Sequence, residues 1–66
     1  MIMKPVVSSS ISAIGYDNMS QTLYIRFIKG KTYSYYNVPT NVYEGLNNAK
    51  SKGRYYANFI KGRYNG

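Results

Sequence analysis

The chain has 66 residues, of which nine are lysine or arginine and two are acidic, so its formal net charge is +7. It contains no cysteine and no histidine, which excludes disulfides, thiolate or imidazole metal sites, and catalytic pairs built on either side chain. No stretch approaches the roughly 18 consecutive apolar residues of a membrane span, so we expect a cytoplasmic protein without a membrane partner. This length predicts one domain over residues 1–66, with residues 1–6 and 65–66 flexible.

The first predicted strand covers residues 8–16. Ile11 and Ile14 differ in parity along this strand, so a bulge or bend is expected near residues 13–15 if both side chains are buried. Residues 17–21 are rich in turn formers and are expected to connect this strand to the next one.

Residues 22–36 carry the clearest pattern in the chain, which is that of a β-hairpin. The side chains of Leu23, Ile25 and Phe27 point to one face, and those of Tyr24, Arg26 and Ile28 to the other. This period of two is typical of a strand that buries one face. Gly30 supplies a turn residue that tolerates positive φ, and a β-branched and aromatic run follows in residues 32–36. The side chains predicted to face the core are Leu23, Ile25, Phe27, Tyr33 and Tyr35.

A helix is predicted after this hairpin. Pro39 ends the strand ladder, and the Thr40 hydroxyl can cap the first helical amides. Glu44 is expected in the first turn and Lys50 near the end, where the helix dipole favours each charge. The apolar stripe of this helix consists of Val42, Tyr43, Leu46 and Ala49.

Residues 54–60 predict a second, shorter helix. Tyr55 and Tyr56 cannot share one helix face, so Tyr55 is expected to be exposed. Residues 61–64 predict either a basic, aromatic tail or a short final strand. Together, the elements predict an α+β fold, in which a three-stranded antiparallel meander is followed by one longer and one short helix packed on one sheet face. The side chains of the second helix expected to face inward are Tyr56, Phe59 and Ile60.

A set of spaced residues runs through most of the chain: Val7, the serine run 8–10 with Ile11, Ile14-Gly15-Tyr16-Asp17, Leu23-x-Ile25-x-Phe27, Gly30, Tyr33-x-Tyr35, Val38-Pro39, Ala49, Ser51, Gly53, Tyr56, Ile60 and Tyr64. Over roughly residues 7–64, this set resembles the KTSC domain. That small domain is named for its occurrence at the C-terminus of some lysyl-tRNA synthetases, and it also occurs as a single-domain protein in bacteria and their phages. The resemblance implies a link to RNA by context and no settled activity.

The sequence offers little catalytic chemistry. Asp17 falls in or beside a turn and Glu44 on a helix, so neither paired acid–base carboxylates nor a magnesium or calcium cage is expected. The serines at residues 8–10 have no evident base beyond a lysine. Residues 30–32 resemble only the tail of a phosphate-binding loop, because the upstream glycine and the following helix are missing. We therefore expect no enzymatic activity, no catalytic residue, no metal and no cofactor.

The sheet face turned away from the helices is the first candidate interface. Aromatic rings beside cations can stack bases and hold phosphates, as in several single-strand binders. The alternative is that the rings only stabilise the hairpin, or that another segment covers this face. The candidate residues on this face are Tyr24, Arg26 and Tyr36, bordered by Lys29 and Lys31.

A second basic cluster surrounds the junction of the helices and the C-terminal end. A helix start near Gly53 would add backbone amides to its positive field and suit a phosphate, whereas a solvated basic loop is the simpler interpretation. The candidate residues of this cluster are Lys52, Arg54, Lys61 and Arg63, next to Lys50 and with Tyr55 as a stacking ring.

Three binding functions fit this basic, tyrosine-rich chain. The leading prediction is a non-enzymatic module that contacts RNA or single-stranded nucleic acid through lysine, arginine and stacked tyrosine. The alternative is a protein-interaction module, monomer or homodimer, that docks on an acidic protein or pairs through a sheet edge. A third is a pocket for a small anionic nucleotide between helix and sheet.

Overall fold

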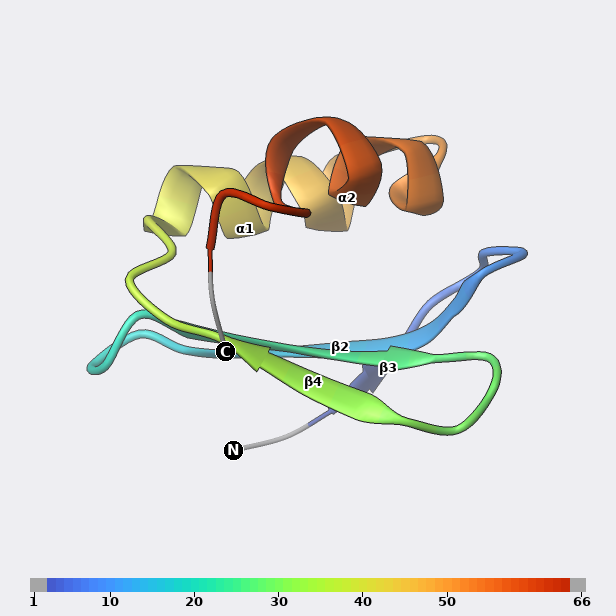
Figure 1. The fold of residues 1–66 in the computed structure, drawn as a ribbon, viewed down its shortest axis with the longest axis horizontal. Helices are drawn as coiled ribbons and strands as arrows, with labels where there is room; N and C mark the ends of the chain where they lie inside the picture. The colour runs from blue at the N-terminus through green and yellow to red at the C-terminus, as the bar shows by residue number, and fades with distance from the viewer. Residues whose placement is uncertain (1–2, 65–66) are drawn as a thin grey trace.

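The computed structural model describes residues 3–64 as an antiparallel sheet with two helices on one of its faces (Figure 1). The strands lie in sequence order across the sheet. The predicted α+β class is confirmed, but the sheet has four strands where three were predicted. Within these residues, neither helix has the length and apolar composition to cross a membrane. The elements are β1 (Lys4–Pro5), β2 (Ile11–Asp17), β3 (Thr22–Phe27), β4 (Thr32–Tyr35), α1 (Thr40–Asn48) and α2 (Lys52–Phe59).

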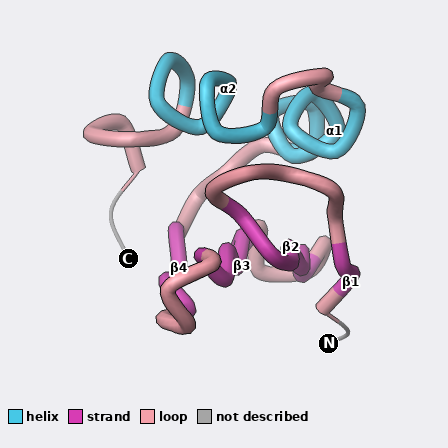
Figure 2. The backbone as a smooth tube through the Cα atoms, turned by 90° about the vertical axis from the view of Figure 1, so that its right-hand side faces the viewer, coloured by secondary structure: helices cyan, strands magenta, loops and turns pink. Residues whose placement is uncertain are grey.

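The additional strand, β1, pairs with β2 at the edge of the sheet opposite β4 (Figure 2). It lies within the lead-in that was predicted to be flexible, and the Val6 amide extends the pairing by donating to the Ser12 carbonyl. A proline is compatible with an edge strand because its missing amide can face away from the ladder. Two residues with a proline carry no alternating pattern, which explains why this strand was missed. The remaining residues predicted to be flexible, 1–2 and 65–66, lie outside the described residues.

A bulge in β2 reconciles its two buried isoleucines. Ile11 pairs with Phe27 and Ala13 with Arg26, so one extra residue, Ser12, stands in β2. This changes the parity, and both Ile11 and Ile14 are fully buried. The predicted bulge is therefore present, just before residues 13–15 where it was expected.

The β3–β4 turn has the three-residue geometry that glycine permits. The Gly30 amide donates to the Phe27 carbonyl at 2.8 Å, and the Phe27 amide donates to the Lys31 carbonyl at 2.9 Å. Gly30 has φ +104°, as its place in the turn predicted. The turn thereby brings Lys29 and Lys31 to the end of the sheet next to Phe27.

The helices cover the sheet face that carries the core. Helix α1 packs there through Val42, Tyr43 and Leu46 of the predicted stripe, whereas Ala49 lies just after its end as the C-cap. Leu46 is fully buried, and Tyr43 stacks on Tyr16 of β2 with ring centroids 4.6 Å apart. The predicted cap was wrong: Pro39 is the N-cap and Thr40 is the first helical residue. Glu44 therefore follows the first turn, and Lys50 lies after the helix has ended.

Helix α2 begins at Lys52, two residues before the predicted start, because the Ser51 hydroxyl caps it by accepting from the Arg54 amide. Ile60, directly after the helix, is fully buried as predicted. Phe59 was expected to face inward, but 51% of its surface is exposed. Within the described chain, residues 61–64 form turns rather than the alternative final strand.

Two glycines of the helices allow a matched test of this packing. A Cβ atom on Gly45 of α1 would overlap the Tyr55 hydroxyl, which is held by donating to the Val42 carbonyl at 3.1 Å. A Cβ atom on Gly53 of α2 would meet only the hydroxyl of exposed Ser10, which can rotate away. We expect Gly45→Ala to lower the free energy of unfolding by about 1–3 kcal/mol. Gly53→Ala should leave it unchanged or raise it by up to about 1 kcal/mol, as helix propensity favours alanine.

Urea denaturation of the two variants beside the parent chain measures both changes. Equal destabilisation by the two substitutions would contradict the close approach of α2 to α1 at Gly45.

Candidate functional site

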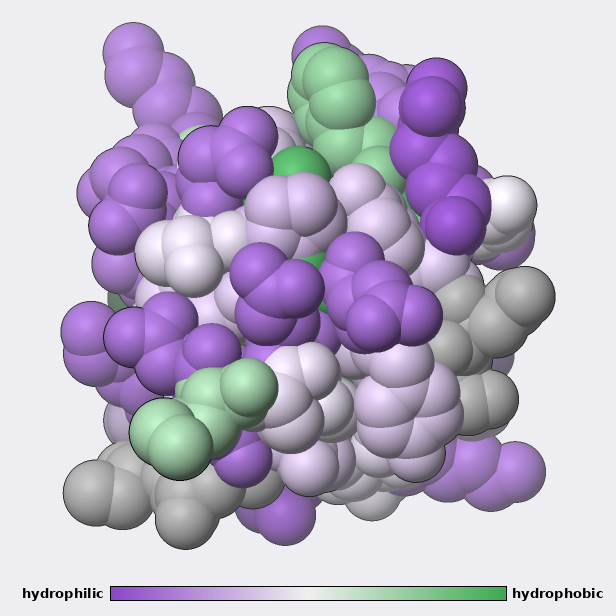
Figure 3. Space-filling view, turned by 90° about the vertical axis from the view of Figure 1, so that its left-hand side faces the viewer, coloured by the Kyte–Doolittle hydropathy of each residue, from purple (hydrophilic) through white to green (hydrophobic). Residues whose placement is uncertain are grey.

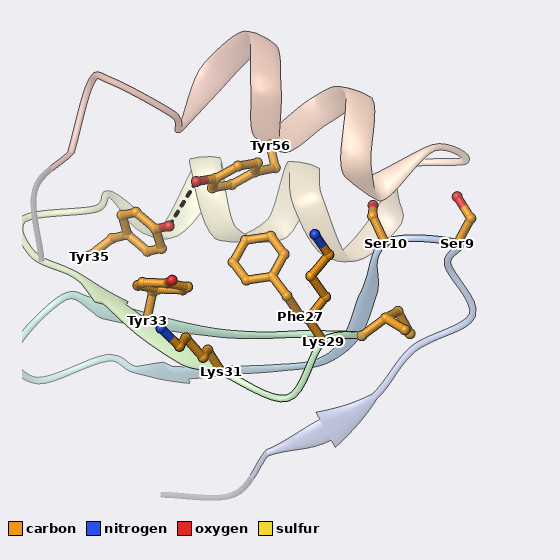
Figure 4. Close-up of a pocket in the computed structure, with 9 residues that line it drawn as sticks. Ser9, Ser10, Phe27, Lys29, Lys31, Tyr33, Tyr35 and Tyr56 are labelled. Atoms are coloured by element: carbon orange, nitrogen blue, oxygen red, sulfur yellow. Dashed lines mark hydrogen bonds between the residues drawn. The ribbon is translucent and has the colours of Figure 1, made fainter.

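An aromatic cleft opens between the β3–β4 hairpin and α2, and Figure 4 shows its side chains. It encloses about 740 Å³, a size typical of small-molecule sites. Its two walls come from segments far apart in the sequence, the sheet on one side and α2 on the other. The residues that line the cleft are Ser9, Ser10, Phe27, Ile28, Lys29, Lys31, Tyr33, Tyr35 and Tyr56.

Strand alternation directs the rings of the sheet into the cleft. Tyr33 pairs with Ile25 and Tyr35 pairs with Leu23, so both tyrosines share the sheet face that the helices cover. The Phe27 ring meets the rings of Tyr33 and Tyr56 edge to face, at centroid distances of 5.6 and 5.3 Å. These contacts fix the ring orientations. The cleft therefore has an ordered aromatic wall.

The inner end of the cleft holds a pair of phenols. The hydroxyls of Tyr35 and Tyr56 are 2.8 Å apart and form a hydrogen bond that joins β4 to α2 (Figure 4). Tyr35 is 8% exposed, and its burial, with this hydrogen bond, raises its pKa above the ordinary tyrosine value. The Tyr35 phenol is therefore neutral at physiological pH, and it offers a hydrogen bond without charge.

The mouth of the cleft is positive. Lys29 and Lys31 are exposed residues of the β3–β4 turn, and Figure 4 shows the Lys29 side chain extending beside Phe27 toward α2. Among residues 3–64, neither Asp17 nor Glu44 lines the cleft. An anion entering the cleft therefore finds two cationic side chains beside the rings.

The open sheet face carries three of the predicted site residues. Tyr24 and Arg26 lie on the side away from the helices, because they alternate with buried Leu23 and Ile25. Tyr36 follows buried Tyr35 and is 52% exposed. Helices α1 and α2 both lie on the other side of the sheet (Figure 1), so neither helix covers this face.

The side chains of the open face are partly engaged within the sheet. The Arg26 Nε atom donates to the Thr32 hydroxyl at 3.2 Å, from the directly paired position of β4. Tyr24 is half-buried opposite Ser34. The structure thus separates the predicted site: Tyr24, Arg26 and Tyr36 stay on the open face, whereas Lys29 and Lys31 line the cleft.

The second predicted cluster has structural roles at two positions. The Lys52 ammonium donates to the Ala49 carbonyl at 2.9 Å, which satisfies the end of α1. Tyr55 was predicted to be exposed, and this was wrong: its ring is half-buried against α1 and Phe59. Tyr55 and Tyr56 lie on different faces of α2, and each face has its own packing partner. Arg54, Lys61 and Arg63 are exposed, and within residues 3–64 none of them lines the cleft.

The sequence left open a nucleotide pocket between helix and sheet, but the pattern assigned the cleft rings to the core, so none of them was among the predicted site residues. Phe27, Tyr33, Tyr35 and Tyr56 were all predicted to face inward, and they do lie between sheet and helix. Tyr33, however, is 47% exposed. The sequence did contain one indication of a cleft. Tyr33, Tyr35 and Tyr56 would bring three phenol hydroxyls to one inner surface, which is more than a closed apolar core accommodates.

Comparison with known proteins gives consistent matches. Residues 7–64 match the family model of the KTSC domain. A protein of Tsukamurella paurometabola is 47% identical over 62 residues, which are 94% of this chain and 92% of that protein. The crystal structure of a KTSC domain protein from Yersinia pestis has a TM-score of 0.93 and 40% identity, covering 96% of this chain and 89% of that one. A lysine–tRNA ligase of Nostoc punctiforme is 43% identical over 63 residues, and the match spans 96% of this chain but 11% of the ligase.

Tyr35 makes the stability of this fold sensitive to alkaline pH. Its raised pKa means that the folded state holds the phenol proton more tightly than the unfolded chain does. The stability that this proton contributes is complete below about pH 10, the ordinary tyrosine pKa, and is lost as the pH rises further. We expect this group to lower the free energy of unfolding by about 1.4 kcal/mol per pH unit above about pH 10, measured by urea denaturation.

The control is Tyr35→Phe, which cannot ionise at this position. Its stability should decline less steeply across the same pH range, and equal slopes in the two proteins would contradict the assignment.

Proposed function

This chain belongs to the KTSC domain family, as its resemblance over residues 7–64 predicted, and we propose that it is a non-enzymatic module that binds RNA or single-stranded nucleic acid. One observation carries the proposal: an aromatic cleft with Lys29 and Lys31 at its mouth. Every base has a π face that can stack on an aromatic ring, and ammonium groups attract the adjoining phosphates. The cleft offers both kinds of contact among its lining residues.

The shape of the cleft favours a single strand over a duplex. Bases in a duplex are stacked and paired, so their faces cannot enter a pocket between a sheet and a helix, whereas unstacked bases in loops and ends can. The net charge of +7 attracts any polyanion and supplies affinity without sequence preference. The match to part of a lysine–tRNA ligase adds a context in which RNA is present.

The dependence of binding on salt tests the electrostatic part of this proposal. If about four phosphates are neutralised, the logarithm of the association constant for a single strand should fall with the logarithm of salt concentration at a slope of about −3. Fluorescence anisotropy with labelled single-stranded RNA, single-stranded DNA and duplex DNA, each at several salt concentrations, measures this slope. Salt-insensitive binding, or a preference for the duplex, would contradict the proposal.

Three charge-matched variants locate the contact. Lys31→Gln removes one charge at the cleft, Arg26→Gln removes one on the open sheet face, and Lys4→Gln removes one in β1. Loss of one phosphate contact should reduce the salt slope by about 0.7 for Lys31→Gln. The other two variants should keep the parent slope. The reverse result would move the interface to the open face.

The outer edge of β4 supports a second candidate function, pairing with a protein strand. β4 ends the strand order, and the Phe27–Lys31 hydrogen bond sets which backbone groups face outward. With the observed register, the amides of Thr32 and Ser34 point away from β3, toward a position with no strand within the described residues. Figure 3 views the molecule along the strands rather than onto this edge, and the side it shows carries mostly hydrophilic side chains.

Ser34→Pro tests this second function because proline removes the outward amide while leaving the hydrogen-bonded positions of the β3–β4 pair unchanged. A homodimer or a nuclease-resistant protein complex formed through β4 should be lost in this variant, as measured by size-exclusion chromatography and pull-down. Binding that survives Ser34→Pro would exclude the edge as the contact.

A further inference from the structure

We propose that the cleft holds a single unstacked nucleotide, with its base against Phe27 and Tyr33, the polar edge of the base at the Tyr35–Tyr56 hydroxyl pair, and its phosphate at Lys29 and Lys31. This inference rests on the proposed function and names the unit that the site recognises. The proposed function needs only a surface that binds a strand, whereas this inference assigns a pocket for one nucleotide. That nucleotide lies either at a strand end or turned out of a loop.

The gradient of polarity along the cleft sets the direction of the ligand. Tyr35 at the inner end is 8% exposed, whereas Tyr33 on the wall is 47% exposed. The two lysines stand on the turn at the mouth. A phosphate would lose its solvation at the inner end without meeting a cation, so it stays at the mouth. The uncharged base can occupy the inner end of the cleft instead.

The hydroxyl pair leaves hydrogen-bonding capacity for a ligand. Two phenols carry two O–H donors, and the bond between Tyr35 and Tyr56 uses one of them. Both residues line the cleft, so the other O–H and the remaining lone pairs are available to a ligand there. A base edge carries donors and acceptors side by side, so it can complete this pair. The neutral state of buried Tyr35 means that the inner end does not repel an anionic ligand.

The aromatic wall supplies a stacking surface. The Phe27 ring is held edge to face between Tyr33 and Tyr56, so it is fixed before a ligand arrives. Half of the Tyr33 surface is accessible, which allows this ring to lie over a base. Stacking on such a ring is tolerant of base identity, whereas the hydroxyl pair distinguishes the base edges.

The experiment is a titration of the intact chain, followed by amide NMR shifts, with four nucleoside 5′-monophosphates, ribose 5-phosphate and inorganic phosphate. We expect the monophosphates to bind about tenfold or more tightly than ribose 5-phosphate, because only they carry a base. The shifts should concentrate at Phe27, residues 29–31, Tyr33, Tyr35 and Tyr56. Equal affinity for inorganic phosphate and the monophosphates would overturn the proposal, since the site would then read the anion alone.

Two tyrosine variants of similar exposure provide the matched control. Tyr33 is 47% exposed and lines the cleft, whereas Tyr36 is 52% exposed on the other side of the sheet. Tyr33→Ala should weaken monophosphate binding about tenfold, and Tyr36→Ala should leave it unchanged. Tyr56→Phe keeps the ring and removes the hydroxyl, so it should reduce the differences among the four bases while ribose 5-phosphate binding stays the same.

The outcomes separate this inference from the proposed function. Single-stranded RNA that binds equally well to Tyr33→Ala and Tyr36→Ala, with no monophosphate binding, would overturn the nucleotide pocket and leave the strand-binding function intact. Failure of both RNA and monophosphates to bind the parent chain would overturn both. Amide spectra with parent-like dispersion show that each variant is folded, and Tyr56→Phe tests the pocket without creating a cavity.

Discussion

The hydrogen bond between the Tyr35 and Tyr56 hydroxyls joins the sheet to α2 across the cleft. Residues of α2 itself are half-buried or exposed, so this short helix attaches through few groups: Tyr56 on the sheet, Tyr55 on α1, and Ile60 directly after its end. Because the Tyr56 hydroxyl bonds the Tyr35 hydroxyl, the two rings stand between α2 and β4. The helix therefore lies farther from the strand than direct packing of aliphatic side chains would place it. The same distance opens the cleft. The same two tyrosines therefore attach α2 to the sheet and line the cleft, at positions where a larger domain would use leucine.

Charge imposes a second constraint on this small fold. The nine basic residues repel one another, and only two acidic residues offset them. A chain of this size buries only about 60% of its unfolded surface to oppose that repulsion. Lys29 and Lys31 lie in an exposed turn, where water screens their charges. The Lys52 ammonium donates to the Ala49 carbonyl at the end of α1. A bound polyanion would relieve the remaining repulsion, so we infer that ligand binding and folding stability are coupled in this chain.

Local patterns predicted the hairpin, Gly30 and the stripe of α1 because each depends on neighbours in the sequence. The features that were missed depend on distant partners. β1 forms only because β2 presents an edge to Lys4–Pro5, and Tyr55 is half-buried only because α1 lies beside α2. The same reason applies to the site. Alternation placed Tyr33 and Tyr35 on the helix side correctly, but whether α2 closes over both rings is a property of the packed helix, and Tyr33 remained accessible.

The two sheet faces differ in how far the fold itself already uses the contacts that their side chains can make. On the open face, Arg26 already donates to Thr32, and Tyr24 is half-buried against the sheet, so a ligand there would have to compete with contacts that the fold has made. In the cleft, the rings are oriented by one another, and the phenol pair keeps an unused donor. Preorganised groups with unsatisfied capacity bind at lower cost than groups that must first be released. This difference, rather than the number of cations, is the reason for proposing the interface on the side of the sheet that the helices cover.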